Sequence, residues 1–183
     1  MTLHFIVGSF LSINNNIKGE NNMINLEEIT ILADTREKKN QHILDYCQTQ
    51  GMKVEHRKLN YGDYSIIVND QDFSNCISVE RKASLDELAG NFTRSRECFK
   101  KEFGRMIETG GNMIVVVENG SISDITNHKY ISKFHPNAFN ASIKSFENNF
   151  NTQFSFMKRH QSPEFIIDWL IGNATSEELA EVA

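Results

Sequence analysis

Two short runs of strand-forming residues, joined by a turn, constrain the fold of this chain more than any other feature. The runs are Tyr64 to Val68 and Cys76 to Val79, and the segment between them is Asn69-Asp70-Gln71-Asp72. β-Branched and aromatic residues favour strands, whereas clustered Asn and Asp favour turns. The pattern therefore predicts a β-hairpin, with Gly62-Asp63 just before its first strand and Glu80-Arg81-Lys82 at the end of its second.

The hairpin determines which charged side chains meet. If its centre lies between residues 71 and 72, Asp63 is directly opposite Glu80 in the neighbouring strand. Directly opposed side chains lie about 5 Å apart, where two negative charges repel each other, so a cation between them would be stabilising. A shift of one residue in the pairing would instead place the two acids on opposite faces of the sheet. Glu80 and Lys82 share a face, and Arg81 points to the other face.

The residue types at these positions suit the hydrolysis of phosphodiester bonds. Carboxylates bind hard divalent cations through oxygen, which makes Asp63 and Glu80 candidate metal ligands. The reaction also needs a group that delivers the attacking water or offsets the negative charge that grows at phosphorus. Lys82 is the candidate for that role.

Each motif also has a structural interpretation. Gly62-Asp63 alone is typical of a turn, and Glu80-Arg81-Lys82 alone is typical of a solvated ion-pair cluster. Asp34-Thr35-Arg36-Glu37 follows the apolar run Ile29 to Ala33 and is typical of a helix N-terminus with favourable acids. Because buried-type residues precede Glu80, however, unpaired charges there would be costly. The combination of the three motifs favours a catalytic site that also includes Asp34 and Glu37.

The rest of the chain alternates between predicted helices and strands. Ser84-Leu85-Asp86-Glu87 is a capping box, and Ser162-Pro163-Glu164 is a second helix-start pattern. Besides the hairpin we expect helices at about 38–50, 85–90, 96–109, 137–150 and 162–171, the last ending before Gly172, and strands at 29–34, 52–59, 113–117 and 152–157. These elements show no βαβ rhythm and indicate an α/β sheet with helices packed around it.

A cluster of basic residues lies between residues 94 and 105, where the only acids are Glu97 and Glu102. Basic side chains of this kind bind the phosphates of nucleic acids, although a solvated helix face explains the pattern almost as well. The candidate nucleic-acid contacts in this cluster are Arg94, Arg96, Lys100 and Lys101.

Composition limits the class of protein. With 183 residues, 39% of them hydrophobic and 23% charged, the chain is typical of a globular protein with one domain. Its net charge of −5 is unlike that of a nonspecific DNA-binding protein, so a nucleic-acid contact is expected from a local patch. The three cysteines match neither a zinc pattern nor a disulfide framework, which favours a reducing cytoplasm. The apolar run Leu3 to Leu11 is too short to span a membrane.

The chain is expected to fold as a single domain at 26–172, after an N-terminal extension at 1–25 and before an acidic flexible tail at 173–183. Lys18 to Met23 can be encoded by a purine-rich ribosome-binding site just ahead of an ATG codon. One hypothesis is therefore that translation starts at Met23, in a bacterium or its phage. The alternative is that the preceding residues form a genuine disordered arm.

At these motifs the chain resembles the nuclease domain of XPF-type structure-specific endonucleases, a branch of the restriction-endonuclease-like superfamily. The family motif is Gly-Asp, a variable gap, Glu-Arg-Lys and then an Asp four residues after the Lys. Gly62-Asp63, Glu80-Arg81-Lys82 and Asp86 match it in full, and Asp34, Arg36 and Glu37 match the preceding Asp-x-Arg-Glu element. The resemblance covers about 29–118 and extends more loosely to Phe156.

The resemblance implies a mixed central sheet flanked by helices, Mg²⁺ or Mn²⁺ as cofactor, and cleavage of DNA at branched or flap structures. It implies that Asp63, Glu80 and Asp34 bind the metal, that Glu37 is a further acidic group, and that Lys82 orients or activates water. Arg36 and Arg81 would contact nucleic acid, and Arg81 would also support the site, together with Gly62 and Asp86.

One departure concerns targeting. Relatives that select branched DNA commonly carry a C-terminal tandem helix-hairpin-helix module and pair with a second subunit, and no such hairpin motif follows Phe156. A stand-alone nuclease domain would form a homodimer, borrow a targeting partner or have looser specificity. The alternative function is a catalytically silent subunit that binds DNA or stabilises a partner, and the substrate polymer could also be RNA.

Overall fold

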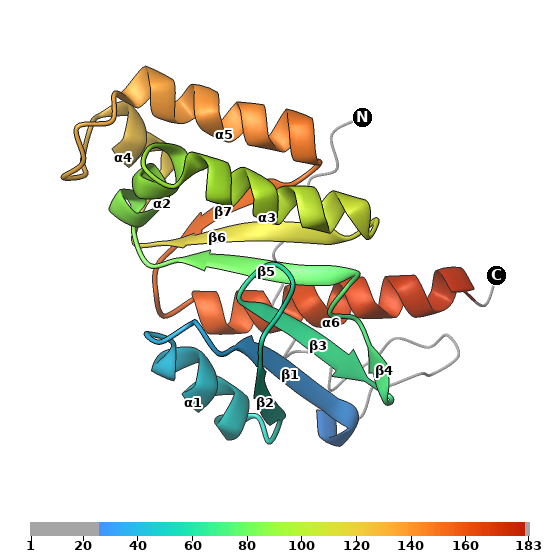
Figure 1. Cartoon of the computed structure of the whole chain (residues 1–183). Helices are drawn as coiled ribbons and strands as arrows, with labels where there is room; N and C mark the ends of the chain where they lie inside the picture. Colours follow the sequence, from blue (N-terminus) through green and yellow to red (C-terminus); the bar gives the residue numbers. More distant parts are fainter. Residues whose placement is uncertain (1–25, 182–183) are drawn as a thin grey trace, which may run out of the picture.

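The computed structural model describes residues 26–181, which form a seven-stranded sheet with helices on both faces (Figure 1). The predicted N-terminal extension and the alternative start at Met23 lie outside the described residues. The elements, in chain order, are η2 (Leu26–Glu28), β1 (Ile29–Asp34), α1 (Gln41–Thr49), β2 (Lys53–Arg57), β3 (Tyr64–Val68), β4 (Gln71–Asp72), β5 (Ile77–Lys82), α2 (Leu85–Phe92), α3 (Arg96–Glu108), β6 (Asn112–Glu118), α4 (Ile122–Thr126), α5 (Pro136–Phe150), β7 (Gln153–Met157) and α6 (Ser162–Glu181).

The sheet mixes parallel and antiparallel pairs, as predicted. Its order is β2-β1-β3-β5-β6-β7, and β4 pairs only with β3. β1 and β3 pair antiparallel, as do β3 and β5, whereas β1–β2, β5–β6 and β6–β7 are parallel. The expectation of no βαβ rhythm was wrong, because helices connect all three parallel pairs. The antiparallel strands in the middle of the sheet, and the two helices in each later connection, hide that rhythm in the sequence.

The hairpin forms, but its turn lies earlier than predicted. Asn69 and Asp70 both adopt positive φ angles, 49° and 64°, in a two-residue turn between β3 and β4. Such angles suit Asn and Asp and match the twist of a tight hairpin. A loop after β4 then inserts four residues, so that Val79 rather than residue 75 faces Tyr64. The resulting pairing of β3 with β5 has the predicted register.

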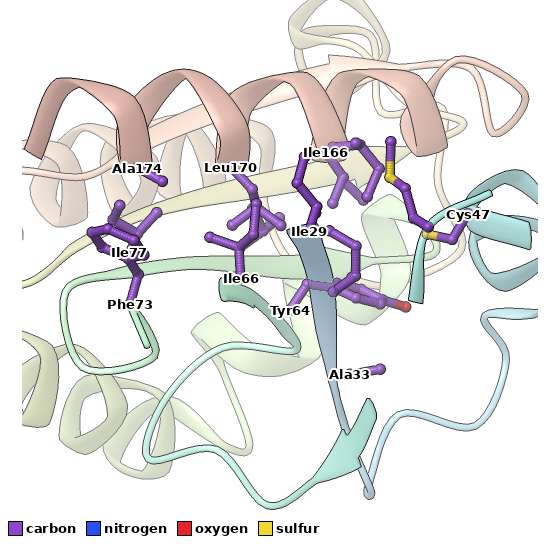
Figure 2. Packing of buried hydrophobic residues seen from close by; sticks show 14 of the residues in the cluster. Ile29, Ala33, Cys47, Tyr64, Ile66, Phe73, Ile77, Ile166, Leu170 and Ala174 are labelled. Atoms are coloured by element: carbon purple, nitrogen blue, oxygen red, sulfur yellow. The ribbon is translucent and has the colours of Figure 1, made fainter. Parts of the chain in front are cut away.

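Two hydrophobic cores lie on the two faces of the sheet. α1 and α6 cover one face, where Ile166, Leu170 and Ala174 of α6 lie over strand residues that include Ile66 and Ile77 (Figure 2). α2, α3 and α5 cover the other face, with a core rich in phenylalanine, including Phe92, Phe99, Phe103, Phe139 and Phe146. Burial of these faces, at about 25 cal/mol per Å² of apolar surface, holds the strand ends that carry the charged motifs in place.

The last helix differs from the prediction. α6 does not end at Ile171 but continues through Gly172 to Glu181. Ala174 is fully buried in the core between the sheet and the helices α1 and α6. This packing outweighs the modest helix-breaking tendency of a single glycine. Among the described residues, no helix is both long and apolar enough to cross a membrane.

Candidate active site

Three acids lie in one row across neighbouring strands. Ala33 pairs with Tyr64 and Tyr64 with Val79, so the next position along aligns Asp34 with Asp63 and Asp63 with Glu80. Backbone hydrogen bonds hold this row, from Asp34 N to Asp63 O and from Asp63 N to Val79 O, each 2.8 Å long. The row is at the end of the sheet where β1 and β5 finish and β3 begins (Figure 1).

Asp63 and Glu80 are the two acids of the row whose pKa values are raised. Burial, and then the charge of Glu80, raises the pKa of Asp63 well above its usual value. Burial raises the pKa of Glu80 to about 7, against the lowering effect of Lys82. One Asp63 oxygen accepts a hydrogen bond of 2.8 Å from Arg81 N, which fixes the carboxylate beside β5. Two carboxylates that resist being charged together would be stabilised by a cation.

This donor set fits a hard divalent ion. Mg²⁺ is usually held by one or two carboxylates, and waters and substrate phosphates complete its coordination. Within residues 26–181 no group of three or more His, Cys, Asp or Glu side chains is arranged to hold a metal. Asp63 and Glu80, the two opposed acids of the row, stay the predicted metal ligands.

Lys82 lies beside the acidic pair. Its ammonium makes an ion pair with Glu80, and it lies 5.4 Å from the centre of the Phe99 ring. Burial alone would lower the pKa of Lys82, but the charges of Glu80 and Asp63 raise it above its usual value. A lysine that stays protonated can donate hydrogen bonds to a phosphate or to a water, but it cannot accept a proton.

Asp34, a predicted metal ligand, lies in the row with its carboxylate already hydrogen-bonded. Both of its oxygens accept hydrogen bonds from Arg36, at 2.7 to 2.8 Å, and one also accepts from Leu59 N at 2.7 Å. These bonds lower the pKa of Asp34, although burial alone would raise it. Asp34 thus anchors the loop that precedes Asp63. The Arg36 side chain remains 56% exposed, so part of it faces solvent above the row.

Arg81, a predicted nucleic-acid contact, is buried and paired with two acids. Its side chain is only 3% exposed and donates to Glu118 at 2.8 and 2.6 Å and to Glu37 at 3.3 Å. Glu37, the further acid of the predicted site, is therefore turned toward Arg81, and its charge also adds to the raised pKa of Asp63. Arg81 supports the site from the opposite face of the sheet, because alternate strand residues point to opposite faces.

Gly62 meets a strict steric limit. Its φ of +70° is unfavourable for other residues, and a Cβ there would lie 1.9 Å from the Ser78 hydroxyl. That hydroxyl donates to the carbonyls of Tyr61 and Tyr64, at 3.0 Å each. A glycine is therefore needed where the chain enters β3 and presents Asp63.

Asp86 and the basic residues lie outside the row. Asp86 accepts hydrogen bonds from Ile131 N and Ser132 N, at 2.9 and 2.6 Å, and so holds the α4–α5 loop. Arg96 donates to Ser142 at 3.1 Å and stacks over Phe146, so it fastens α3 to α5. The remaining basic candidates are at the surface: Lys100 pairs with Glu97 at 3.4 Å, and Arg94 and Lys101 are exposed.

Glu102 is a residue that the sequence analysis missed. Its carboxylate accepts a hydrogen bond of 2.9 Å from Gly62 N, and its charge raises the pKa of both Glu80 and Arg36. One turn further along α3, Arg105 donates to Asn60 O at 2.7 Å. The sequence does contain a signal for this role of Glu102. Glu102 follows Phe99 by three residues and so lies next to the apolar stripe of the helix that faces the sheet.

The residues of the site lie in the part of the chain that matches known proteins. The family model of the ERCC4 domain matches residues 33–169. XPF from Aeropyrum pernix is similar in structure, with 18% identity and a TM-score of 0.59, over 84% of this chain and 68% of that chain. XPF from Aeropyrum pernix in complex with DNA gives the same identity and TM-score, over 81% and 66%. The chain thus spans about two thirds of those chains. None of the curated proteins matches. The fold is the predicted α/β, restriction-endonuclease-like one.

Proposed function

The chain belongs to the ERCC4-domain family, and from this premise we propose that it is an endonuclease that hydrolyses phosphodiester bonds of DNA with Mg²⁺ or Mn²⁺. The family supports a nuclease function in general terms. The metal dependence, the catalytic residues and the structure of the DNA are the parts that we propose.

The observation that carries the proposal is the opposed pair of Asp63 and Glu80. Both carboxylates have raised pKa values, chiefly because they are desolvated. Asp63 directly precedes β3, its backbone N–H donates to Val79 O of β5, and Glu80 is the next residue of β5. Lys82 makes its ion pair with Glu80, and its charge also lowers the pKa of Asp63, yet the pKa of Asp63 stays well above its usual value. The pair would hold a divalent ion, which supplies positive charge against the phosphate and lowers the pKa of bound water.

The side chains around the pair have complementary roles in this proposal. Lys82, protonated and next to Glu80, would donate a hydrogen bond to the phosphate or to the attacking water. Arg36, partly exposed above the row, would contact a neighbouring phosphate while it remains paired with Asp34. Glu102, which accepts from Gly62 N, and the backbone N–H of Arg81, which donates to Asp63, would keep Asp63 in position.

The proposed substrate is DNA, with a preference for branched or flap structures. A solved relative is XPF in complex with DNA, which favours DNA over RNA as the polymer. Because the chain has a net charge of −5, its binding of DNA would depend on local cationic groups and on the metal rather than on the overall charge. Selection of a branch would come from a homodimer or a targeting partner. The thiols of Cys47 and Cys98, which form no disulfide, are compatible with the proposed location in a reducing cytoplasm.

A substrate panel tests the function. Flap, fork, linear and supercoiled DNA, and RNA of the same sequences, are incubated with the full chain and Mg²⁺, Mn²⁺ or a chelator. We expect cleavage of DNA only with a metal, and most rapidly at branched ends. Cleavage of RNA alone, or of DNA in the chelator, would refute the proposal.

A catalytically silent DNA-binding or partner-stabilising subunit is the second candidate. Two observations favour it: Lys82 makes an ion pair with Glu80, and no group of three or more possible metal ligands exists among the described residues. Titration calorimetry with Mn²⁺ distinguishes the two. An endonuclease binds Mn²⁺ and loses the binding with Glu80→Gln, whereas a silent subunit shows no such heat in either protein.

A further inference from the structure

A groove separates the end of α2 from the loop that joins α4 to α5. It has a volume of about 700 Å³, and the residues that matter here are Asp86, Arg94, Ile131, Lys133, Phe134 and His135. Figure 1 shows this loop beside α2, at the end of the molecule toward which β5 runs. We call this feature the basic groove.

The loop wall of the basic groove is held in one conformation, although it has no regular secondary structure. Asp86 accepts hydrogen bonds from Ile131 N and Ser132 N. The rings of Tyr130 and Phe134 pack on the buried ring of Phe139, with centroids 5.3 and 5.4 Å away. A wall that is fixed before binding loses little conformational entropy when a ligand arrives.

The charges at the basic groove are unbalanced. Arg94, Lys133 and His135 are exposed at it, and within residues 26–181 neither Arg94 nor Lys133 takes part in an ion pair. Among the described residues that line the groove, Asp86 is the only carboxylate, and two backbone amides of the loop already donate to it. A protein with a net charge of −5 therefore presents a local cationic surface here, which complements an anion.

The basic groove is close to the catalytic row. Asp86 follows Lys82 by four residues, so their Cα atoms are at most about 14 Å apart. A DNA strand advances about 3.4 Å per nucleotide along its axis, so a strand at Lys82 reaches the groove within about four nucleotides. Ile131, which is 92% exposed at the rim, adds apolar surface that suits a sugar or a base rather than a free ion.

From these relationships we propose that the basic groove binds the backbone of the DNA strand that leaves the catalytic row, through Arg94 and Lys133. The assignment rests on the proposed function, because that function identifies the anion as DNA. The contacts are to phosphates, so they contribute affinity and orientation rather than sequence preference.

Fluorescence anisotropy tests the proposal without cleavage. The full chain with Asp63→Asn is titrated onto a labelled DNA duplex with a single-stranded tail, in a chelator and at several salt concentrations. Adding Arg94→Ala and Lys133→Ala should weaken binding about tenfold and reduce the slope of log affinity against log salt by about 1.5, since each phosphate contact contributes about 0.7 to 0.9. The control adds Lys53→Ala and Lys144→Ala, which remove two exposed lysines elsewhere.

The outcomes separate the two proposals. Equal affinity and slope for the groove and control variants, or no DNA binding by the parent protein, would overturn the groove assignment. Tighter, groove-dependent binding of RNA of the same sequence would overturn DNA as its occupant. Groove-dependent DNA binding by a wild-type protein that cuts no substrate would support the groove and refute the endonuclease.

Discussion

Arg81 donates two hydrogen bonds to Glu118, at 2.8 and 2.6 Å, and both side chains are almost completely buried. The pair joins β5 to β6 on the face of the sheet opposite Lys82. Glu118 also accepts one hydrogen bond from the Ser162 hydroxyl, at 2.5 Å, and its Oε1 lies 2.7 Å from Nε2 of His42. The strand that carries Glu80 and Lys82 is thus tied to its neighbour by charges that do not take part in the proposed chemistry.

Removal of one partner of the Arg81–Glu118 pair should destabilise the folded protein. Glu118→Ala leaves the Arg81 guanidinium buried without its main acceptor, and we expect it to lower the free energy of unfolding by about 3–5 kcal/mol. Glu97→Ala, which breaks the exposed pair with Lys100, is the control and should change it by less than about 1 kcal/mol. Urea unfolding measures both, and similar values for the two variants would contradict the interpretation.

The raised pKa of Glu80 predicts a pH dependence of stability. Because its pKa is about 7 in the folded protein and 4.5 as the ordinary value, the folded state binds more protons between these values. Its contribution to stability is therefore present below pH 4.5 and is lost as the pH rises through about 7. Without metal, the free energy of unfolding of wild type minus that of Glu80→Gln should fall over this range. A difference that stays constant or rises with pH would contradict the raised pKa of Glu80.

Glu102 should affect cleavage through the position of Asp63. Glu102→Ala removes the acceptor of Gly62 N and should lower the cleavage rate about tenfold or more, whereas Glu102→Gln keeps an acceptor and should retain most of it. Glu97→Ala on the same helix, with a side chain 77% exposed, is the control. Steady-state rates on the preferred DNA measure the effect. Equal losses in Glu102→Gln and Glu102→Ala would mean that the charge, and not the hydrogen bond, matters.

A side chain should be much more destabilising at Gly62 than at Gly110, which has the same φ angle. Gly62→Ala places a Cβ against Ser78, but Gly110→Ala, also at φ +70°, meets nothing within 4 Å. Both variants carry the cost of a positive φ, and Gly62→Ala should lose about 1–3 kcal/mol more because of the overpacking. Thermal and urea unfolding compare them, and equal losses would argue against the steric account.

The motif positions could be predicted from sequence because strand alternation and cross-strand pairing depend on local residue types. The predicted register of Asp63 and Glu80 was correct, although the predicted turn lay two residues too late. The real turn at Asn69 and Asp70 comes earlier, and the four-residue insertion after β4 compensates for this difference. The helix start at Ser84 also followed from local chemistry, and its hydroxyl accepts from Glu87 N at 3.2 Å.

The rest depends on contacts between distant segments. Asp34 was expected at the metal from the family resemblance, and that role stays a prediction. Its hydrogen bonds from Arg36 and from Leu59, 25 residues away, could not be predicted from sequence. Glu102 acquires its role only when α3 packs beside Gly62. The end of α6 was misjudged at Gly172, because the burial of Ala174 depends on the sheet beneath it.

The central claim is that Asp63 and Glu80 hold the metal with which DNA is cut. The most direct measurement is the rate of cleavage of the preferred DNA in Mg²⁺ by wild type, by Asp63→Asn and by Asp70→Asn, the last at an exposed turn. The account predicts a loss on the order of 100-fold for Asp63→Asn and wild-type activity for Asp70→Asn. Equal rates for wild type and Asp63→Asn would contradict it.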